Sequence, residues 1–293
     1  MYTIIINPTS GGGEALKRLP EIEALLKEKG LNYCKKIAET PEMATEFARL
    51  ATQDGSEGVI AVGGDGTLSR IVNGLAHSAT PLIFAACGTG NDFVKSLELP
   101  KDLIKALDCQ LEAPAKMIDI GKVNDIYFLN VSGTGFDVDV LRQAEKYKAK
   151  YTGLRAYLYG LFDAIKHFKP MTAMISIDGA PAEKLSFTIL SIGNGRYFGG
   201  GMKAVPDAKV NDGLFDMIAV RPVKKATIFT LVFIFVLGLH VKVGLGKLKR
   251  CKKILLHCPG ATINIDGELT NMDTAEFSIQ ENAIAVRIPS LVN

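Results

Sequence analysis

The sequence GGDGT at residues 63–67 brings three glycines and one carboxylate together at the end of an apolar run. Glycines leave the backbone N–H groups of a turn uncovered, and the start of a helix adds about half a positive charge. Such a turn suits a phosphate group. Asp65 repels a phosphate unless a divalent cation lies between them, so this residue favours a metal nucleotide as the ligand. The simpler alternative is a tight strand-to-helix turn in which Asp65 caps the helix.

Two more glycine-bearing turns end apolar runs of the chain, NPTSGGG at residues 7–13 and CGTGNDF at residues 87–93. In the second of these turns, Asn91 or Asp92 can cap a following helix. Open α/β sheets bind ligands at the carboxyl ends of their parallel strands, so the three turns together predict one nucleotide site. The sequence contains no P-loop, no GxGxxG fingerprint and no protein-kinase catalytic loop, and its four histidines are isolated.

The elements that must hold these turns follow from the periodicity of the first half of the chain. Short apolar or β-rich runs predict strands at residues 3–7, 32–38, 58–64 and 81–88. Helical patterns fill the intervals at roughly residues 14–29, 41–53 and 67–77. Strands that alternate with helices at this spacing predict βαβ units and a parallel sheet that is covered on both faces.

The chain changes character after residue 123. Helices are predicted at about residues 136–147 and 153–168, and a series of short strands follows. Turn dipeptides such as Asp178-Gly179 and Asp266-Gly267 join these strands, which indicates an antiparallel sheet or sandwich. A chain of 293 residues is long enough for two domains that meet near residue 123.

Composition and charge narrow the functional classes. Hydrophobic residues make up 47% of the chain and charged residues 22%, which is typical of a globular protein. The net charge of +3 is too small to indicate nucleic-acid binding by itself. The five cysteines form no CxxC pair, so we expect reduced thiols in a cytoplasmic protein instead of a disulfide framework or a zinc site. The first residues have no basic region and only a short apolar run, so we expect no signal peptide.

An apolar run at residues 227–239 is too short for a transmembrane helix, which needs about 20 such residues. A group of basic residues follows it: Lys242, Lys247, Lys249, Arg250, Lys252 and Lys253. The simpler interpretation is a core helix followed by a solvated basic connection. The alternative is a docking surface for anionic lipid, to which each basic residue can contribute about 1 kcal/mol.

Five motifs occur along the chain in a fixed order: NPTSG, GGDGTLSRIVNGL, CGTGNDF, VPDAKVNDGLFDM at residues 205–217 and NIDGE at residues 264–268. Together they resemble the diacylglycerol-kinase catalytic-domain family, particularly its soluble bacterial lipid kinases. GGDGT alone is shared with NAD kinases. The resemblance implies an α/β fold with two domains: an N-terminal NAD-kinase/phosphofructokinase-like nucleotide-binding domain at residues 1–122, and a C-terminal antiparallel β-sandwich domain for the lipid at residues 123–283. It also implies that the last strand, about residues 284–293, returns to the first domain.

The resemblance further implies which residues form the site. ATP would contact Asn7, Pro8, Thr9, Ser10, Gly11, Gly63, Gly64, Asp65, Gly66, Thr67, Leu68, Ser69 and Thr89. Asp65 would lie beside the phosphates and their Mg²⁺ and serve catalysis, and Glu268 would be the general base. A structural Mg²⁺ would be held by the side chain of Asp212 and the carbonyls of Lys209 and Leu214. Some relatives carry a lysine where this chain has Gly12, and a second lysine in the helix predicted at residues 153–168, near the position of Gly160 in this chain.

The function expected from these residues is an ATP- and Mg²⁺-dependent lipid kinase that phosphorylates the hydroxyl of a diacylglycerol-like lipid in phospholipid biosynthesis. Such an enzyme would be cytoplasmic and would bind peripherally at the inner face of the membrane. We expect no nucleic-acid partner, and the sequence does not decide between a monomer and a homodimer. The alternatives are an NAD kinase-like enzyme and a non-catalytic, membrane-sensing nucleotide-binding protein. Asp266 competes with Glu268 as the base, because alternate residues of a strand point to the same face.

Overall fold

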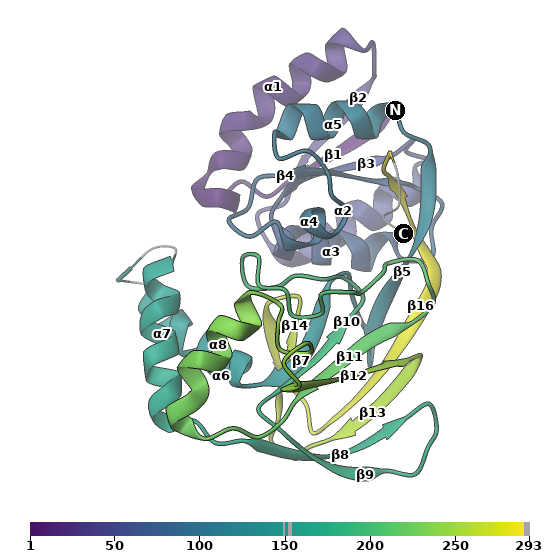
Figure 1. Ribbon diagram of the computed structural model, residues 1–293. Coiled ribbons are helices and arrows are strands. Elements are labelled where there is room, and N and C mark those ends of the chain that lie inside the picture. The colour runs from purple at the N-terminus through teal and green to yellow at the C-terminus, as the bar shows by residue number, and fades with distance from the viewer. Residues whose placement is uncertain (149, 152–153, 290–293) are drawn as a thin grey trace.

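The first half of the chain alternates strands with helices, as its apolar periodicity predicts. The computed structural model describes residues 1–148, 150–151 and 154–289. In it, four parallel strands lie in the order β2-β1-β3-β4 (Figure 1). They are β1 (Tyr2–Ile6), β2 (Tyr33–Ile37), β3 (Val59–Gly63) and β4 (Leu82–Ala86). Each of them matches one of the predicted runs.

Helices cover both faces of this parallel sheet. They are α1 (Glu14–Glu28), α2 (Pro41–Gln53), α3 (Asp65–Leu75), α4 (Asp92–Ser96) and α5 (Leu103–Glu112), together with the short 3-10 turn η1 (Ser10–Gly12). Because successive strand residues point to opposite faces, Ile4 packs in a core with α1 and α5, whereas Ile5 packs in a core with α2 and α3. The apolar strands are therefore buried on both sides, and their polar turns are left at the carboxyl ends.

The second half of the chain is a sandwich of antiparallel strands, as predicted. One sheet has the order β12-β11-β10-β7-β14-β15. Its strands are β7 (Val131–Gly135), β10 (Ile189–Gly193), β11 (Phe215–Val220), β12 (Gly246–Cys251), β14 (Thr262–Ile265) and β15 (Glu268–Asn271). The facing strands are β5 (Ala115–Val123), β6 (Ile126–Phe128), β8 (Met171–Ile177), β9 (Glu183–Phe187), β13 (Lys253–His257) and β16 (Thr274–Arg287). Between the two layers, Phe128 and Phe215 stack with ring centroids 5.8 Å apart.

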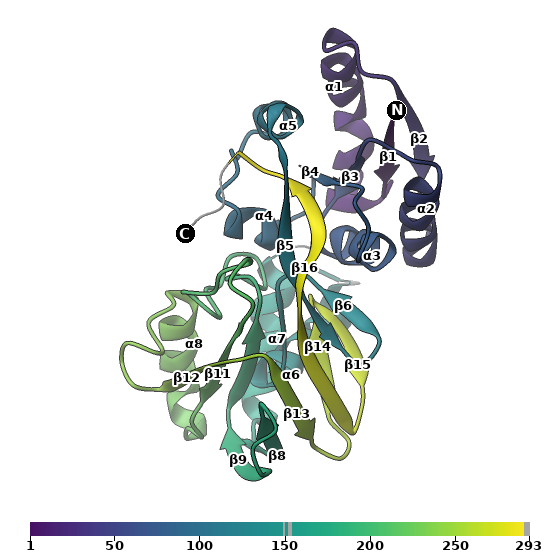
Figure 2. The same cartoon turned by 90° about the vertical axis from the view of Figure 1, so that its right-hand side faces the viewer.

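The strand β16 joins the two halves into one ten-stranded sheet. It pairs with β13 and β5, changes register between Gln280 and Ile284, and then reaches β4, where Val286 pairs with Leu82. Figure 2 shows β5 and β16 as the two strands that run from the lower layers into the upper sheet. The division at residues 1–122 and 123–283 stays a prediction, because this sheet continues across it. Residues 290–293 of the expected last strand lie outside the described residues.

Three helices pack on the outer face of the six-stranded sheet (Figure 1). They are α6 (Phe136–Lys148), α7 (Leu154–His167) and α8 (Ile228–Val236), the last preceded by the short turn η2 (Lys225–Thr227). The first two match the predicted helices, apart from residue 153, which lies outside the described residues. No helix in the described ranges is both long enough and apolar enough to cross a membrane.

The apolar run and the basic segment after it differ from their simpler interpretation. The helix α8 is not a core helix, because Phe229 is 58% exposed and Phe233 is 66% exposed. Of the following basic residues, Lys247, Lys249 and Arg250 are solvated as predicted but lie in the edge strand β12 instead of a connection, and Lys253 begins β13. An edge strand with exposed side chains carries no alternating apolar pattern, so its sequence did not predict a strand.

Candidate active site

The three predicted glycine turns converge at the carboxyl end of the parallel sheet. A Cβ on Gly64 would lie 2.9 Å from the Cα of Gly88, so the second and third turns touch through their backbones. A Cβ on Gly11 would overlap the carbonyl oxygen of Cys87, which brings in the first turn. The Nδ2 of Asn7 donates to the Oγ1 of Thr67 at 3.1 Å. The glycines are thus required for close backbone approach, and the turns form one structure.

The start of α3 suits an anion. Gly64 occupies the N-cap position, and no side chain caps this helix. Its first N–H groups are therefore available to a ligand, together with the positive end of the helix dipole. Asp65 does not cap α3; its Oδ1 accepts a hydrogen bond from the N–H of Phe93 at 3.1 Å. The simpler alternative for Asp65 is therefore not what the structure shows.

A cavity of about 260 Å³ lies against this turn. Its lining includes Asn7, Ser10, Thr40, Gly64, Gly66, Thr67, Arg70 and Glu268. It adjoins a second cavity of about 520 Å³, because Arg70 and Glu268 line both. The second cavity also contains Ser69. These spaces bring residues from the first and second predicted turns together with Glu268 from the second half of the chain.

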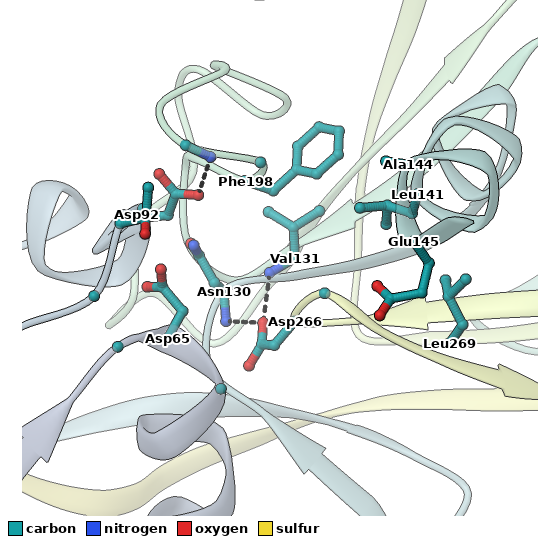
Figure 3. Close-up of a pocket in the computed structure, with 18 residues that line it drawn as sticks. Asp65, Asp92, Asn130, Val131, Leu141, Ala144, Glu145, Phe198, Asp266 and Leu269 are labelled. Carbon is teal, nitrogen blue, oxygen red and sulfur yellow. Dashed lines mark hydrogen bonds between the residues drawn. The ribbon is translucent and has the colours of Figure 1, made fainter. Parts of the chain in front are cut away.

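The largest of the three cavities described here, about 600 Å³, lies on the other side of the glycine turn (Figure 3). Three carboxylates lie at one end: Asp65, Asp92 and Asp266. Apolar side chains line much of the rest: Val131, Leu141, Ala144, Phe198 and Leu269. Because Gly64 and Gly66 line both this cavity and the 260 Å³ cavity, the turn at the start of α3 separates a polar space from a partly apolar one.

Not every predicted ATP contact lines these spaces. Thr89 lines the largest cavity, and Thr9 donates through its N–H and hydroxyl to the Oδ1 of Asn7. Five residues line none of the three cavities: Pro8, Thr9, Gly11, Gly63 and Leu68. The side chain of Leu68 is buried in the core, so this residue can offer a ligand only its backbone.

Asp65 and Asp92 lie close together in the largest cavity (Figure 3). A Cβ on Gly90 would be 2.9 Å from Asp65 Oδ2 and 3.4 Å from Asp92 Oδ2. Burial raises the pKa of Asp65, and the neighbouring charge of Asp92 raises it further. Two adjacent carboxylates offer the oxygen ligands that a divalent cation prefers, and here Lys95 pairs with Asp92 Oδ1 at 3.1 Å while the N–H of Gly200 donates to Asp92 Oδ2. From the sequence, Asp92 was predicted only as a helix cap, and its approach to Asp65 was not predicted.

Asp266 occupies a turn and not a strand position. Its backbone has φ 48°, and its carboxylate accepts hydrogen bonds from the N–H groups of Leu129, Asn130 and Val131 at 2.7–3.1 Å. Burial raises the pKa of Asp266 to about 7, and the charge of Asp65 adds to the effect. Because β14 ends before this residue, the alternation of strand side chains does not relate Asp266 to Glu268.

Glu268, the predicted base, lies on the polar side of the glycine turn. It is the first residue of β15 and lines the two smaller cavities. The Nε of Arg70 donates to its Oε1 at 3.0 Å, and the Nη2 of Arg70 pairs with its Oε2. The structure therefore places Asp266 and Glu268 in different cavities. Neither Arg70 nor Thr40 was predicted from the sequence, although the position of Thr40 as the N-cap of α2 before Pro41 is a local signal.

The predicted structural metal site is a turn next to the sandwich. Asp212 Oδ1 accepts from the N–H of Leu214 at 3.2 Å, and its Oδ2 pairs with Arg250. Within the described parts of the chain, no three His, Cys, Asp or Glu side chains gather in a way that could hold a metal ion. The carboxylate of Asp212 and two backbone carbonyls are the oxygen ligands that Mg²⁺ prefers, but here the guanidinium of Arg250 balances the negative charge of Asp212. The set of Lys209, Asp212 and Leu214 stays a prediction.

The basic residues after α8 do not form one patch. Lys247 and Lys249 lie opposite Ala219 and Met217 of β11, which belong to the inner core of the sandwich and not to the core beneath α8. Arg250 pairs with Asp212 and Asp216, and Lys252 pairs with Glu281. The positive charge expected beside the apolar run is thus partly neutralised and partly turned away from α8.

Gly160 lies where α7 crosses α6. A Cβ on Gly160 would be 2.5 Å from the backbone nitrogen of Ala144 and 2.7 Å from its Cα. A lysine at this position would force the two helices apart. In contrast, nothing lies within 4 Å of a Cβ on Gly12, although its φ of 69° is unfavourable for other residues.

The chain has clear relatives among known proteins. Residues 1–123 match the family model described as diacylglycerol kinase catalytic domain, and residues 130–288 match the model described as YegS C-terminal NAD kinase beta sandwich-like domain. A diacylglycerol kinase of Staphylococcus aureus is 32% identical over 292 residues, which cover 98% of this chain and 92% of the relative. One of Mycobacterium tuberculosis is 28% identical over 293 residues, with 98% and 94% covered.

Two solved structures support the fold. A crystal structure of a diacylglycerol kinase from Bacillus anthracis has a TM-score of 0.74 at 19% identity, covering 99% of this chain and 98% of that one. The structure of an NAD kinase from Archaeoglobus fulgidus in complex with ATP has a TM-score of 0.55 at 13% identity, covering 99% and 94%.

Proposed function

The chain belongs to the diacylglycerol kinase family, and we propose that it is an ATP- and Mg²⁺-dependent kinase that phosphorylates the hydroxyl of a diacylglycerol-like lipid. One observation carries the proposal: the uncapped start of α3 separates a polar cavity from a partly apolar one. A phosphate held at this turn would face both spaces. Phosphoryl transfer depends mainly on positioning and charge neutralisation, which such a turn supplies.

The two smaller cavities suit the nucleotide. The N–H groups of Gly64 and Gly66 and the polar side chains of Asn7, Ser10 and Thr67 can hold phosphates at the start of α3. The adjoining space extends along α2 and α3, between Thr45, Ser69 and Ile126, and can take the rest of ATP. Bound ATP supplies the phosphoryl group, and Mg²⁺ between Asp65 and Asp92 would neutralise its charge.

The largest cavity suits the acceptor lipid. Its apolar end, with Val131, Leu141 and Phe198, can enclose the part of a lipid next to its head and exclude water from the reacting groups. The carboxylate end adjoins the glycine turn, so a hydroxyl there would meet the phosphate. We place the membrane contact of a peripheral enzyme on the second half of the chain, because the lipid side of this cavity is built there.

We propose Glu268 as the general base, with Asp266 as its competitor. Both oxygens of Asp266 are engaged by three backbone N–H groups, so this residue anchors the hairpin that carries Glu268. Glu268 is paired with the guanidinium of Arg70. A nucleotide phosphate can bind this guanidinium in place of Glu268 and so free the carboxylate. Glu268 lines the nucleotide cavities and Asp266 lines the acceptor cavity, so the released carboxylate of Glu268 would have to reach across the glycine turn to accept the proton of the hydroxyl.

Transfer of radiolabelled phosphate tests the proposed function. The protein is incubated with labelled ATP and Mg²⁺ and either a lipid extract or NAD, and the products are separated by thin-layer chromatography. We expect label in a lipid monophosphate. Label in NADP alone would assign the chain to the NAD kinase alternative, and ATP binding without turnover on any lipid would assign it to the non-catalytic one. A panel of lipid alcohols in mixed micelles then identifies the acceptor.

A further inference from the structure

We propose that the outer faces of α7 and α8 dock on the surface of an anionic phospholipid bilayer. This docking face consists of Leu158, Tyr159 and Phe162 of α7, Phe229, Phe233 and Val236 of α8, and Leu237. The inference rests on the proposed function only for its purpose, which is to bring the enzyme to a lipid substrate. Its physical argument comes from exposure, charge and the position of the largest cavity.

The helix α8 is apolar on all sides, as a buried helix is, but only one of its sides is buried. The sequence IFTLVFIFV contains no charged residue. Ile228, Leu231 and Phe235 pack into the protein, whereas Phe229 and Phe233 are 58% and 66% exposed on the other side. A helix with one side facing water normally carries polar residues on that side. A face that exposes large aromatic residues instead marks a surface that another phase or molecule covers.

The helix α7 extends this apolar surface. The rings of Phe162 and Phe229 lie with centroids 5.8 Å apart, and Phe162 is 51% exposed. Leu158 and Tyr159, three and four residues before Phe162, lie on the same side of α7 and are also exposed. Figure 1 shows α7 and α8 beside each other on the outside of the sandwich. The docking face is thus continuous across two helices.

Lysines border the docking face where the two helices meet. Lys166 and Lys169 follow Phe162, and Lys224 and Lys225 precede Phe229. The Nζ of Lys225 donates to the carbonyl oxygen of Lys166, so the two groups lie next to each other. All four lysines are exposed. Asp163 partly offsets this charge, because its Oδ1 pairs with Lys166 at 3.0 Å.

Aromatic side chains beside lysines fit an anionic bilayer better than a neutral or basic partner. Aromatic and aliphatic groups enter the boundary of the acyl region, and lysines beside them meet the anionic headgroups. The bilayer is therefore the occupant that this combination of side chains favours. The basic strand β12 is not needed for this contact, because Arg250 is already paired with carboxylates.

The docking face also lies behind one wall of the largest cavity. Leu141 and Ala144 of α6 line the cavity, and Ala144 touches α7 at Gly160. On the same two helices, the rings of Tyr147 and Tyr159 stack with centroids 5.4 Å apart. A bilayer on α7 and α8 would therefore be separated from the acceptor cavity by two packed helices, α7 and α6.

Vesicle binding without ATP or substrate tests the proposal. The wild type and two variants, Phe229→Ser/Phe233→Ser and Lys224→Gln/Lys225→Gln, are sedimented with vesicles of phosphatidylglycerol and phosphatidylcholine, and with phosphatidylcholine alone. The matched control is Ile37→Ser/Leu255→Ser, which removes two exposed apolar side chains elsewhere. We expect the aromatic variant to lose at least about tenfold in partitioning and the lysine variant to lose binding only on anionic vesicles, whereas the control binds like wild type.

Equal vesicle binding by the aromatic variant and wild type would overturn the proposal. So would a wild-type dimer, seen by analytical ultracentrifugation, that the aromatic substitutions dissociate without changing vesicle binding, because the face would then join two copies of the chain. Turnover of a short-chain, water-soluble diacylglycerol separates this result from the proposed function. An enzyme that is active on this substrate but binds no vesicle lacks only the docking face, whereas a chain that binds vesicles but transfers no phosphate lacks only the activity.

Discussion

Arg70 and Glu268 form an ion pair that connects α3 with β15 across 198 residues of sequence, with 3.0 Å between Arg70 Nε and Glu268 Oε1. Both residues line the two cavities that we assign to ATP. Helical side chains lean toward the N-terminus of their helix, so the Arg70 guanidinium lies on the side of the glycine turn. A phosphate bound there would compete with Glu268 for the same guanidinium.

This competition predicts opposite effects on ATP affinity. Glu268→Gln should strengthen ATP binding about threefold or more, because Arg70 loses its carboxylate, while kcat falls by about 10², as expected for loss of a general base. Arg70→Gln should weaken ATP binding, and adding Glu268→Gln to it should then change the affinity little. Calorimetric titration without lipid measures the affinities. An ATP affinity that is the same in Arg70→Gln and wild type would remove the guanidinium from the nucleotide site.

Asp266 should give the protein a characteristic pH dependence. Its pKa is about 7 in the folded chain and about 4 when unfolded, so the unfolded state loses a proton that the folded state keeps. Stability from this group therefore falls as the pH rises from about 4 to about 7. Across this range, the melting temperature of wild type should fall relative to that of Asp266→Asn as the pH rises, because Asn does not titrate. A constant difference would mean that Asp266 has an ordinary pKa.

The same variant decides between the two candidate bases. At saturating ATP and at a temperature where both proteins are folded, Glu268→Gln should lose more kcat than Asp266→Asn, because Asp266 mainly anchors its hairpin through three backbone N–H groups. Circular dichroism checks folding. A larger loss of kcat in Asp266→Asn, with Glu268→Gln near wild type, would make Asp266 the base.

Asp65→Asn should separate activity from stability. The substitution keeps the shape and the acceptor for the N–H of Phe93, but removes one of two adjacent carboxylates. We expect at least about a 10²-fold loss of kinase activity with an unchanged or higher melting temperature, because repulsion from Asp92 disappears. Activity within a few-fold of wild type would exclude Asp65 from metal-nucleotide binding.

Removal of metal tests the turn at Asp212. If Mg²⁺ is held there, EDTA should lower the melting temperature of wild type, and Asp212→Ala should lower both activity and stability and abolish the response to EDTA. If the turn is held by Arg250 and the Leu214 N–H alone, EDTA should leave the melting temperature unchanged. The two outcomes are distinguished by thermal denaturation of the wild type with and without the chelator.

The glycines at positions where some relatives carry lysine should differ in tolerance. Gly160→Lys should destabilise the protein by several degrees, because even its Cβ collides with Ala144. Gly12→Lys should cost less, since only its positive φ opposes the change. Comparable melting temperatures for both variants would show that α6 and α7 can separate at little cost.

Short sequence patterns predicted the elements whose formation depends on residues close together in the sequence. The four parallel strands and their glycine turns were found because buried strands are continuous apolar runs that end at polar residues. The strand β12 was missed, because its exposed lysines carry no apolar periodicity. The pairing of Arg70 with Glu268 was also missed, because no spacing in a sequence connects residues so far apart.

The candidate site shows the same limit at single residues. Asp65 was identified by its glycines, but its partner Asp92 was interpreted as a cap, because the approach of both carboxylates to Gly90 is a property of the folded turns. Asp266 was placed on a strand face, but its left-handed backbone turns it into a different cavity from Glu268. For α8, composition identified an apolar helix, and only exposure revealed that half of it faces outward.

The position of β16 determines the order in which the protein can be assembled during synthesis. The edge of β4 receives its neighbour only when Val286 has left the ribosome, long after the rest of the parallel sheet has been made. Until then, the nascent chain carries an unpaired strand edge, which is a template for association with other chains. Translation that stops before β16 would therefore leave a half-built sheet that chaperones must shield, and the two halves cannot be expressed separately without exposing this edge.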